Sequence, residues 1–217
     1  MVSIKKLNKK NNVLRLEISK EPLYYLNSLR RIFMNEIPIM AVDELDIKNN
    51  TSVMYDEVLA HRVGLIPLIT DVKSYSVPEE CTCKGAGCAK CQVQLTLNVK
   101  GPGIIYSKDL VAKDPKIKSV YPEMPIVKLL DEQEVEFSAI AKLGFGKDHA
   151  KHSSGLIFYK HKDLDKASEN VDVEKLKDDF EFIIESWGQL SPEKIVEEGI
   201  NRFDKQISDF EVLIKGI

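Results

Sequence analysis

The sequence lacks the features of a membrane protein, a secreted protein or a basic nucleic-acid-binding protein. No apolar run approaches the roughly 18 residues that a membrane-spanning helix needs, and no apolar segment follows the first lysines, so a secretion signal is not expected. The 31 Lys and Arg residues stand against 34 Asp and Glu residues, which gives a net charge of −3. Proteins that bind nucleic acid mainly through phosphates usually carry a basic excess. A cytoplasmic protein that does not bind DNA or RNA directly is therefore expected.

Motifs of common catalytic sites are also missing. The sequence has no glycine-rich phosphate loop, no G-x-S-x-G nucleophile elbow and no H-E-x-x-H pair. Of the four histidines, we expect His149 and His152 to lie on a solvated basic face and His61 to be a hydrogen-bonded structural residue. The residues alone favour a non-catalytic interaction protein. A stand-alone enzyme that uses His149 or His61 is the alternative from another class.

The chain ends and the centre of the chain differ in their hydrophobic pattern. Alternating apolar residues at 14–18 predict a strand, and apolar residues at helical spacing predict a helix near residues 22–36 that stops before Pro38. The central part, residues 47–170, is rich in short strands and in loops with Pro and Gly. Residues 162–179 are mostly charged and indicate a solvated connector or an exposed helix. An apolar run at 180–184 predicts another strand.

The last segment has the most regular pattern in the sequence. Ser191 is a plausible N-cap, and Pro192 suits the first turn of a helix of about 24 residues. Apolar residues then recur at alternating steps of four and three, which is the 3.5-residue repeat of helices that pack lengthwise: Val196, Ile200, Phe203, Ile207, Phe210 and Ile214. Such a helix could cover its own sheet. Its length favours a partner over part of the seam, because an exposed stripe of this size promotes aggregation.

All four cysteines fall within eleven residues, at Cys81, Cys83, Cys88 and Cys91. Four thiolates can enclose one ion, and a closed tetrahedral site of this kind suits structural Zn²⁺. An iron–sulfur cluster also takes four cysteines, although the common ferredoxin spacing differs. Unligated thiols or a disulfide are further alternatives. A small redox or zinc interaction protein is therefore the second function class that the residues allow.

Several motifs in a fixed order carry a resemblance that covers nearly the whole chain. They are N-S-L-R-R-I-F-M-N-E-I-P-I-M-A-V-D at 27–43, L-A-H-R-V-G-L-I-P-L at 59–68, the cysteine loop, G-F-G-K-D-H-A-K at 144–151 and E-S-W-G-Q-L-S-P-E at 185–193. The sequence resembles the alpha-like subunits of cellular RNA polymerases, and among them most closely the archaeal D subunits.

The resemblance implies an α+β fold and an assembly role. Residues 1–46 and 171–217 would form a composite dimerisation domain, and residues 47–170 an inserted β-rich domain that carries a zinc loop at 81–91. The implied function is that of a non-catalytic scaffold of DNA-directed RNA polymerase, a nucleotidyltransferase. It would pair with the small alpha-like subunit L through the helical seam, join the small subunits N and P, and support the two large catalytic subunits. Contact with DNA would be indirect, through the complex. Asn27, Arg30 and Arg31 would lie at the large-subunit interface.

The sequence departs from the family pattern in two places. Many archaeal relatives carry a ferredoxin-like insertion with its own cysteines after the H-A-K motif, whereas a short polar stretch without cysteine stands there in this sequence. No such iron–sulfur domain is therefore expected. His152 and Ser154 stand where relatives often have Trp and Pro, so the resemblance does not predict the packing at these positions.

Overall fold

The computed structural model describes residues 3–10, 12–162 and 179–216, and it divides the chain into two compact units. The terminal unit consists of Met1–Ile37 and Ser154–Ile217, and the central unit consists of Pro38–Ser153. Both units contain antiparallel sheets and helices. The α+β class expected from the sequence is therefore confirmed.

The terminal unit is built on a four-stranded antiparallel sheet to which both ends of the chain contribute. Its strands are β1 (Ser3–Lys10), β2 (Val13–Ser19), β9 (Gly155–His161) and β10 (Asp179–Ser186). The order across the sheet is β1-β2-β10-β9. Strand β10 lies between β2 and β9 and pairs with each through seven of its eight residues. The two strands expected near residues 14–18 and 180–184 are confirmed, and they lie next to each other in this sheet.

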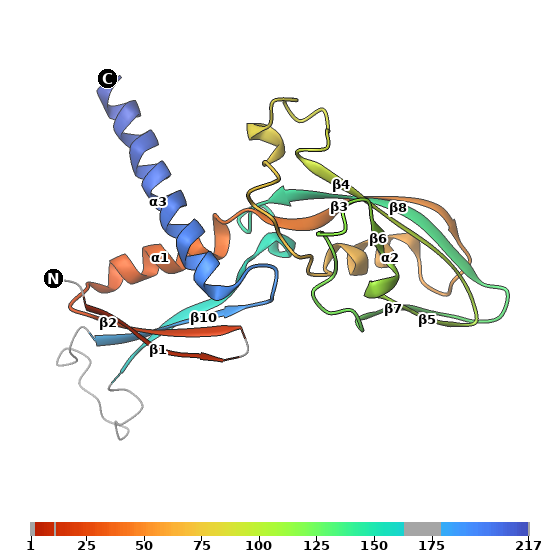
Figure 1. The fold of residues 1–217 in the computed structure, drawn as a ribbon, viewed down its shortest axis with the longest axis horizontal. Coiled ribbons are helices and arrows are strands. Elements are labelled where there is room, and N and C mark those ends of the chain that lie inside the picture. Colours follow the sequence, from red (N-terminus) through yellow and green to blue (C-terminus); the bar gives the residue numbers. More distant parts are fainter. Residues whose placement is uncertain (1–2, 11, 163–178, 217) are drawn as a thin grey trace. The chain divides into compact units, whose positions relative to one another are not determined.

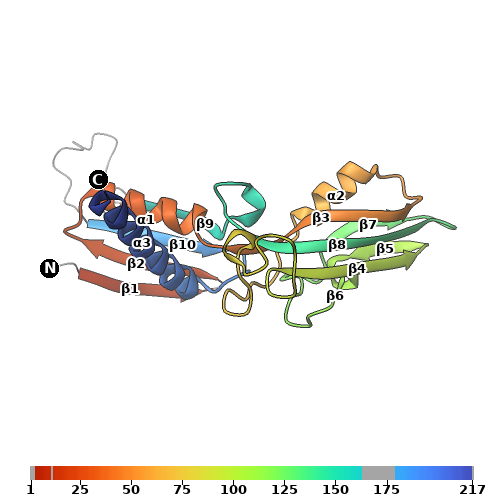
Figure 2. The same ribbon diagram turned by 90° about the horizontal axis from the view of Figure 1, so that it is seen from above.

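Two helices pack on one face of this sheet, α1 (Leu23–Asn35) and α3 (Pro192–Lys215) (Figure 2). The ring of Phe33 from α1 meets the ring of Phe182 from β10 edge to face, with 6.0 Å between the ring centroids. Helix α3 starts where the sequence predicted, because the Ser191 hydroxyl accepts a hydrogen bond from the Lys194 amide at 3.4 Å. Its 24 residues match the expected length.

Helix α3 approaches α1 closely at Gly199, which is buried. A Cβ atom at this position would lie 2.2 Å from Cδ1 of Phe33. Three residues further on, the guanidinium of Arg202 donates a hydrogen bond of 3.2 Å to the carbonyl of Glu36, which caps α1. A cation at a helix C-terminus is favourable for the helix dipole. The first half of α3 is thus fixed onto α1 by a glycine contact and by one charged hydrogen bond.

The central unit contains a second antiparallel sheet in the order β3-β8-β4-β6. Its strands are β3 (Ile39–Asn50), β4 (Gln92–Lys100), β6 (Val111–Ala112) and β8 (Glu134–Gly144). Strand β8 alternates strictly between partly exposed and buried residues, as expected of a strand with one face on the core.

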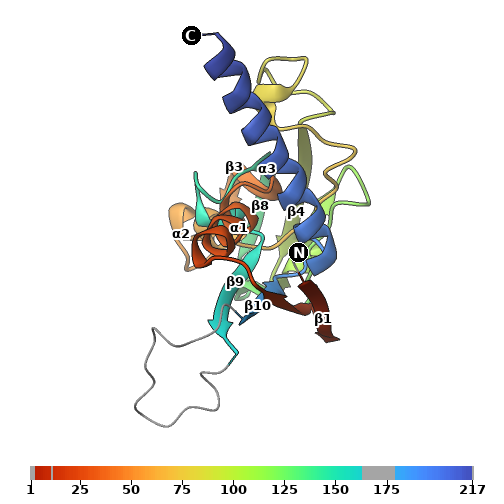
Figure 3. The same ribbon diagram turned by 90° about the vertical axis from the view of Figure 1, so that its left-hand side faces the viewer.

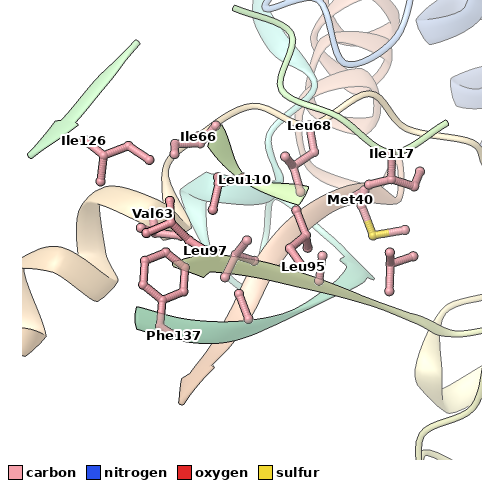
Figure 4. Close-up of a cluster of buried hydrophobic side chains, with 14 of the residues drawn as sticks. Met40, Val63, Ile66, Leu68, Leu95, Leu97, Leu110, Ile117, Ile126 and Phe137 are labelled. Atoms are coloured by element: carbon pink, nitrogen blue, oxygen red, sulfur yellow. The ribbon is translucent and has the colours of Figure 1, made fainter. Parts of the chain in front are cut away.

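The buried face of this sheet belongs to one hydrophobic core (Figure 4). Phe137 of β8 and Leu95 and Leu97 of β4 lie in this core with Val63 of α2 (Asp56–Gly64). Strands β5 (Gly103–Tyr106) and β7 (Pro125–Leu129) form a separate two-stranded sheet. Three short 3₁₀ helices complete the unit: η1 (Pro78–Glu80), η2 (Ser107–Asp109) and η3 (Ala150–His152).

The limits of the two units differ from the boundaries at 46/47 and 170/171 expected from the sequence. Strand β3 begins at Ile39 and pairs with β8 from its first residue, so residues 39–46 belong to the central unit. Strand β9 pairs with β10, so Gly155–His161 belongs to the terminal unit. Strand pairing sets both limits, and the sequence pattern of a single strand does not reveal its pairing partner.

The polar stretch at 162–179, for which a solvated connector or an exposed helix is expected, lies outside the described residues apart from its two ends. At those ends, the Lys162 amide donates a hydrogen bond of 3.1 Å to the carbonyl of Asp179, which continues the pairing of β9 and β10. None of the helices that the structure describes is both long and apolar enough to cross a membrane.

The contact at Gly199 yields a stability prediction. Alanine normally stabilises a helix by about 1 kcal/mol relative to glycine, but here its Cβ would overlap the Phe33 ring. Gly199→Ala should therefore lower the free energy of unfolding of the full chain by about 1–3 kcal/mol in denaturant titrations. Asn201→Ala, at an exposed position of the same helix, should leave it unchanged or raise it. A Gly199→Ala chain more stable than the wild type would contradict the close approach.

Candidate functional site

The four cysteines converge in the central unit, where their sulfur atoms all lie within 4.8 Å of one another. The Sγ atoms of Cys81 and Cys88 are 3.6 Å apart, those of Cys83 and Cys91 3.5 Å, and those of Cys88 and Cys91 3.8 Å. These distances exclude a disulfide, whose sulfurs are about 2.05 Å apart. Four sulfurs at about 2.3 Å from one tetrahedral ion are separated by about 3.8 Å. The cluster therefore has the dimensions of a four-thiolate metal site.

The backbone around the cluster folds as the glycines permit. Gly85 and Gly87 have φ values of +83° and +90°, which L-residues rarely adopt, and Lys84 between the cysteines also has a positive φ. A Cβ on Gly87 would lie 2.7 Å from Oε1 of Gln92, the first residue of β4. The Ser76 amide donates a 2.8 Å hydrogen bond to the carbonyl of Lys90. The loop is thus held at the start of a core strand.

The thiols of the cluster differ in their acidity. Burial raises the pKa of the Cys91 thiol to about 12. At Cys83, desolvation also disfavours the thiolate, but hydrogen bonds from the thiols of Cys91 and Cys81 outweigh it and lower the pKa to about 6. One thiolate can thus form at neutral pH while a buried neighbour stays protonated. A metal ion that binds at this cluster displaces the protons of its thiol ligands, so the four cysteines would bind it as thiolates.

The residues that the resemblance places at a large-subunit interface lie on α1. The guanidinium of Arg30 donates to Oδ1 of Asn27 through Nη2 at 2.9 Å and through Nε at 3.2 Å. Arg31 is exposed. Within the described part of the chain, neither arginine forms an ion pair with a carboxylate. The geometry leaves two cations on one helix available for an acidic or carbonyl-rich surface.

Helix α3 is only partly covered by its own unit. The residues it buries are Pro192, Ile195 and Gly199, of which the seam predicted from the sequence includes none. Of the seam residues, Val196 and Phe203 are half-buried, whereas four are exposed: Ile200, Ile207, Phe210 and Ile214. Phe210 is 62% exposed, and the neighbouring Val212 and Leu213 are also exposed. Figure 3 shows the C-terminal turns of α3 extending beyond α1.

His152 and His61 differ from the sequence expectation, whereas His149 matches it. His152 does not lie on a solvated face: it is buried, its Nδ1 lies 2.8 Å from the carbonyl oxygen of Ile39, and burial lowers its pKa. The reason is that η3 turns its ring against Gly144, where a Cβ would lie 2.6 Å from its Nε2. His149 is exposed as expected. His61 is also exposed, and its side chain makes no hydrogen bond in the part of the chain that is described. His61 and His149 line one open pocket of about 220 Å³.

Ser154, whose packing the resemblance did not predict, is also fully buried. Its hydroxyl donates a hydrogen bond of 2.5 Å to the carbonyl of Phe33 near the end of α1. The polar side chain is thus satisfied inside the terminal unit.

Comparisons with known proteins identify the family. The family described as RNA polymerase Rpb3/RpoA insert domain matches residues 37–158, which is close to the central unit, Pro38–Ser153. The DNA-directed RNA polymerase subunit Rpo3 of Pyrobaculum calidifontis is 36% identical over 225 residues, covering 87% of each chain. The subunit of the same name from Methanothermobacter thermautotrophicus is 48% identical over 130 residues, covering 58% of this chain and 49% of that protein.

The extent of the match differs among these relatives. For the Methanosarcina mazei protein of the same name, 42% identity over 140 residues covers 53% of that protein, so the matched part of the chain spans about half the length of several of its relatives. The family match alone takes in more than half of the present chain. The protein belongs to the Rpb3/RpoA family of RNA polymerase subunits.

Proposed function

We propose that this protein is a non-catalytic assembly subunit of an archaeal DNA-directed RNA polymerase, the counterpart of the D subunit, acting in the cytoplasm. It binds a small alpha-like subunit, L, to form a platform, which the small subunits N and P join. The platform supports the two large catalytic subunits. Contact with DNA is indirect, through the complex. Family membership supports this assignment, since the relatives are named as polymerase subunits.

The exposed apolar half of α3 is the observation that carries the proposal. The terminal unit is the dimerisation domain, and the partner covers Ile207, Phe210 and Ile214 on α3. Burying one large apolar side chain contributes about 1.5–3 kcal/mol before the cost of association. Three such side chains would contribute about 4.5–9 kcal/mol, which is comparable with the cost of association, so they can supply a large part of the pairing energy. The same face would be an aggregation hazard in a chain without a partner.

The remaining contacts follow from surface chemistry. Arg30, held by Asn27, and the exposed Arg31 bind a large subunit through carboxylates or carbonyls. The central unit is the inserted domain, and its four cysteines hold a structural Zn²⁺ that fixes the loop at residues 81–91. Four protein ligands leave no open position on the ion, so the site stabilises structure and does not catalyse a reaction.

The alternative of a redox protein with an iron–sulfur cluster is less well supported. It requires a cluster at the same four cysteines, and the comparisons give polymerase subunits as relatives. A stand-alone enzyme at His61 or His149 has no metal-ligand cluster nearby, because the cysteines are the one such group among the described residues.

The first prediction tests the seam. In the double variant Ile207→Asp and Phe210→Asp, two carboxylates would have to enter an apolar interface, so partner binding should be lost. The measurement is the recovery of the small alpha-like subunit with the tagged full chain, purified from the native host and quantified by peptide mass spectrometry. The double variant should recover less than about a tenth of the wild-type amount.

The matched control carries the same added charge on another face of α3. Asn201 and Ser208 are exposed and seven residues apart, so Asn201→Asp with Ser208→Asp places two carboxylates on one side of the helix, away from the seam. This variant should recover the partner normally. If the seam variant recovered as much of the partner as the control variant does, α3 would not be the interface.

The second prediction concerns the metal. The purified full chain should contain one zinc ion per molecule by mass spectrometric elemental analysis and should be colourless. Cys88→Ser should lose the ion, whereas Thr82→Ala, at an exposed position between two cysteines, should retain it. Acidification should release the ion because protons compete for the thiolates. Iron with visible absorbance would contradict the zinc assignment.

A further inference from the structure

The loop that joins β3 to α2 displays two hydrophobic side chains to solvent. Val53 and Tyr55 are 85% and 80% exposed, the highest values among the large hydrophobic residues that the structure describes. Between them, Met54 is partly buried and packs against the core of the central unit. The side chains therefore alternate outward, inward and outward. The loop lies at the end of the sheet where β3 finishes and β8 begins (Figure 1).

A single asparagine holds this loop rigid. The side-chain oxygen of Asn50 accepts hydrogen bonds from the amide of Ser52 at 3.1 Å and from its hydroxyl at 2.6 Å. The side-chain nitrogen of Asn50 donates to the Met54 carbonyl at 2.9 Å and to a carboxylate oxygen of Asp56 at 2.7 Å. One side chain thus makes four hydrogen bonds within seven residues.

The adjacent turn is bonded to the same loop. The Thr51 amide donates to the Glu134 carbonyl at 3.0 Å, and the Glu134 amide donates to the Thr51 hydroxyl at 2.7 Å. Fixing a loop costs conformational entropy. A loop that is already fixed in the free protein loses little further entropy on binding, and this favours a higher affinity.

Exposed carboxylates occur in both segments that the hydrogen bonds between Thr51 and Glu134 join, and the exposed Lys100 is paired with Glu134 at 2.9 Å. Glu57 is exposed and forms no ion pair within the described part of the chain. In the turn that is bonded to Thr51 through Glu134, Asp131 and Glu132 are exposed and likewise form no ion pair among the described residues. Acidic residues in the first turn of α2 stabilise that helix, but this does not explain the exposure of Val53 and Tyr55. Carboxylates here repel phosphates and favour a partner that carries Lys or Arg.

We propose that residues 50–57 form a preorganised docking loop whose Val53 and Tyr55 insert into an apolar pocket rimmed by Lys or Arg on another polypeptide of the polymerase. This inference rests on the proposed function. It adds a contact on the central unit that is separate from α3 and from Arg30 and Arg31. Tyrosine is enriched among the residues that dominate binding energy at protein interfaces.

The test uses the purified polymerase that contains the tagged full chain. The photoreactive amino acid p-benzoylphenylalanine replaces Tyr55, and in a matched variant it replaces Tyr121, an exposed tyrosine elsewhere in the same unit. After irradiation, the cross-linked peptide is sequenced by mass spectrometry. We expect the probe at position 55 to cross-link one other polymerase subunit, at a site with Lys or Arg within a few residues. The probe at Tyr121 should not label that site.

Substitutions then measure the contribution of the loop. In Val53→Ser with Tyr55→Ser, recovery of the cross-linked subunit in high-salt washes should fall about tenfold or more. The matched pair Val111→Ser with Tyr121→Ser, also exposed in the central unit, should leave recovery unchanged. Asn50→Ala should reduce recovery although it leaves Val53 and Tyr55 in place, because it removes the hydrogen bonds that hold the loop.

The outcomes separate this inference from the proposed function. If the wild-type chain purifies without polymerase subunits, both fail. If the polymerase is intact but the probe at position 55 labels nucleic acid, a second copy of this chain, the chain itself or nothing, the docking loop alone is contradicted. Unchanged recovery with the Val53 and Tyr55 substitutions would also overturn it.

Discussion

The antiparallel pairing of β2 with β10 is the constraint on which the terminal unit depends. It joins Val13–Ser19 to Asp179–Ser186 along seven residue pairs and so brings distant parts of the chain into one sheet. Because β10 also pairs with β9, the chain must leave this sheet after α1 and return at β9. All of Pro38–Ser153 therefore forms a unit inserted into another unit. The same sheet carries α1 and α3 on one face, which places the basic residues of α1 and the seam of α3 on a single scaffold.

The buried residues of α3 all lie in the first third of the helix. Ile195 and Gly199 fix the first turns against the sheet and α1, while the last turns expose Phe210 and its apolar neighbours. A rigid helix that is anchored at one end is well suited to association, because little conformational entropy remains to be lost. The central unit has a different organisation. Its buried hydrophobic residues form one core, and its candidate functional features are loops: the four-cysteine loop and the loop held by Asn50.

The sequence predicts those features that depend on local pattern. The strand at 14–18, the start of α3 at Ser191 and the convergence of the four cysteines all follow from residue spacing. The pairing of strands that are distant in the sequence does not follow from residue spacing. For this reason β9 belongs to the terminal unit and not to the central one, and the limits of the units differ from the expectation. The burial of His152 was also missed, since it depends on the absence of a side chain at Gly144. Likewise, Gly199 and Ile195 carry no signal that separates them from the seam beside them.

The proposed coverage of the apolar half of α3 by another polymerase subunit can be measured directly. Hydroxyl-radical footprinting with mass spectrometry measures the solvent exposure of individual side chains, and it can be applied to the free chain and to the purified polymerase. We expect strong labelling of Phe210 and Leu213 in the free chain and labelling reduced about tenfold or more in the polymerase, because a partner excludes water from interface side chains. Equal labelling in both states would contradict it.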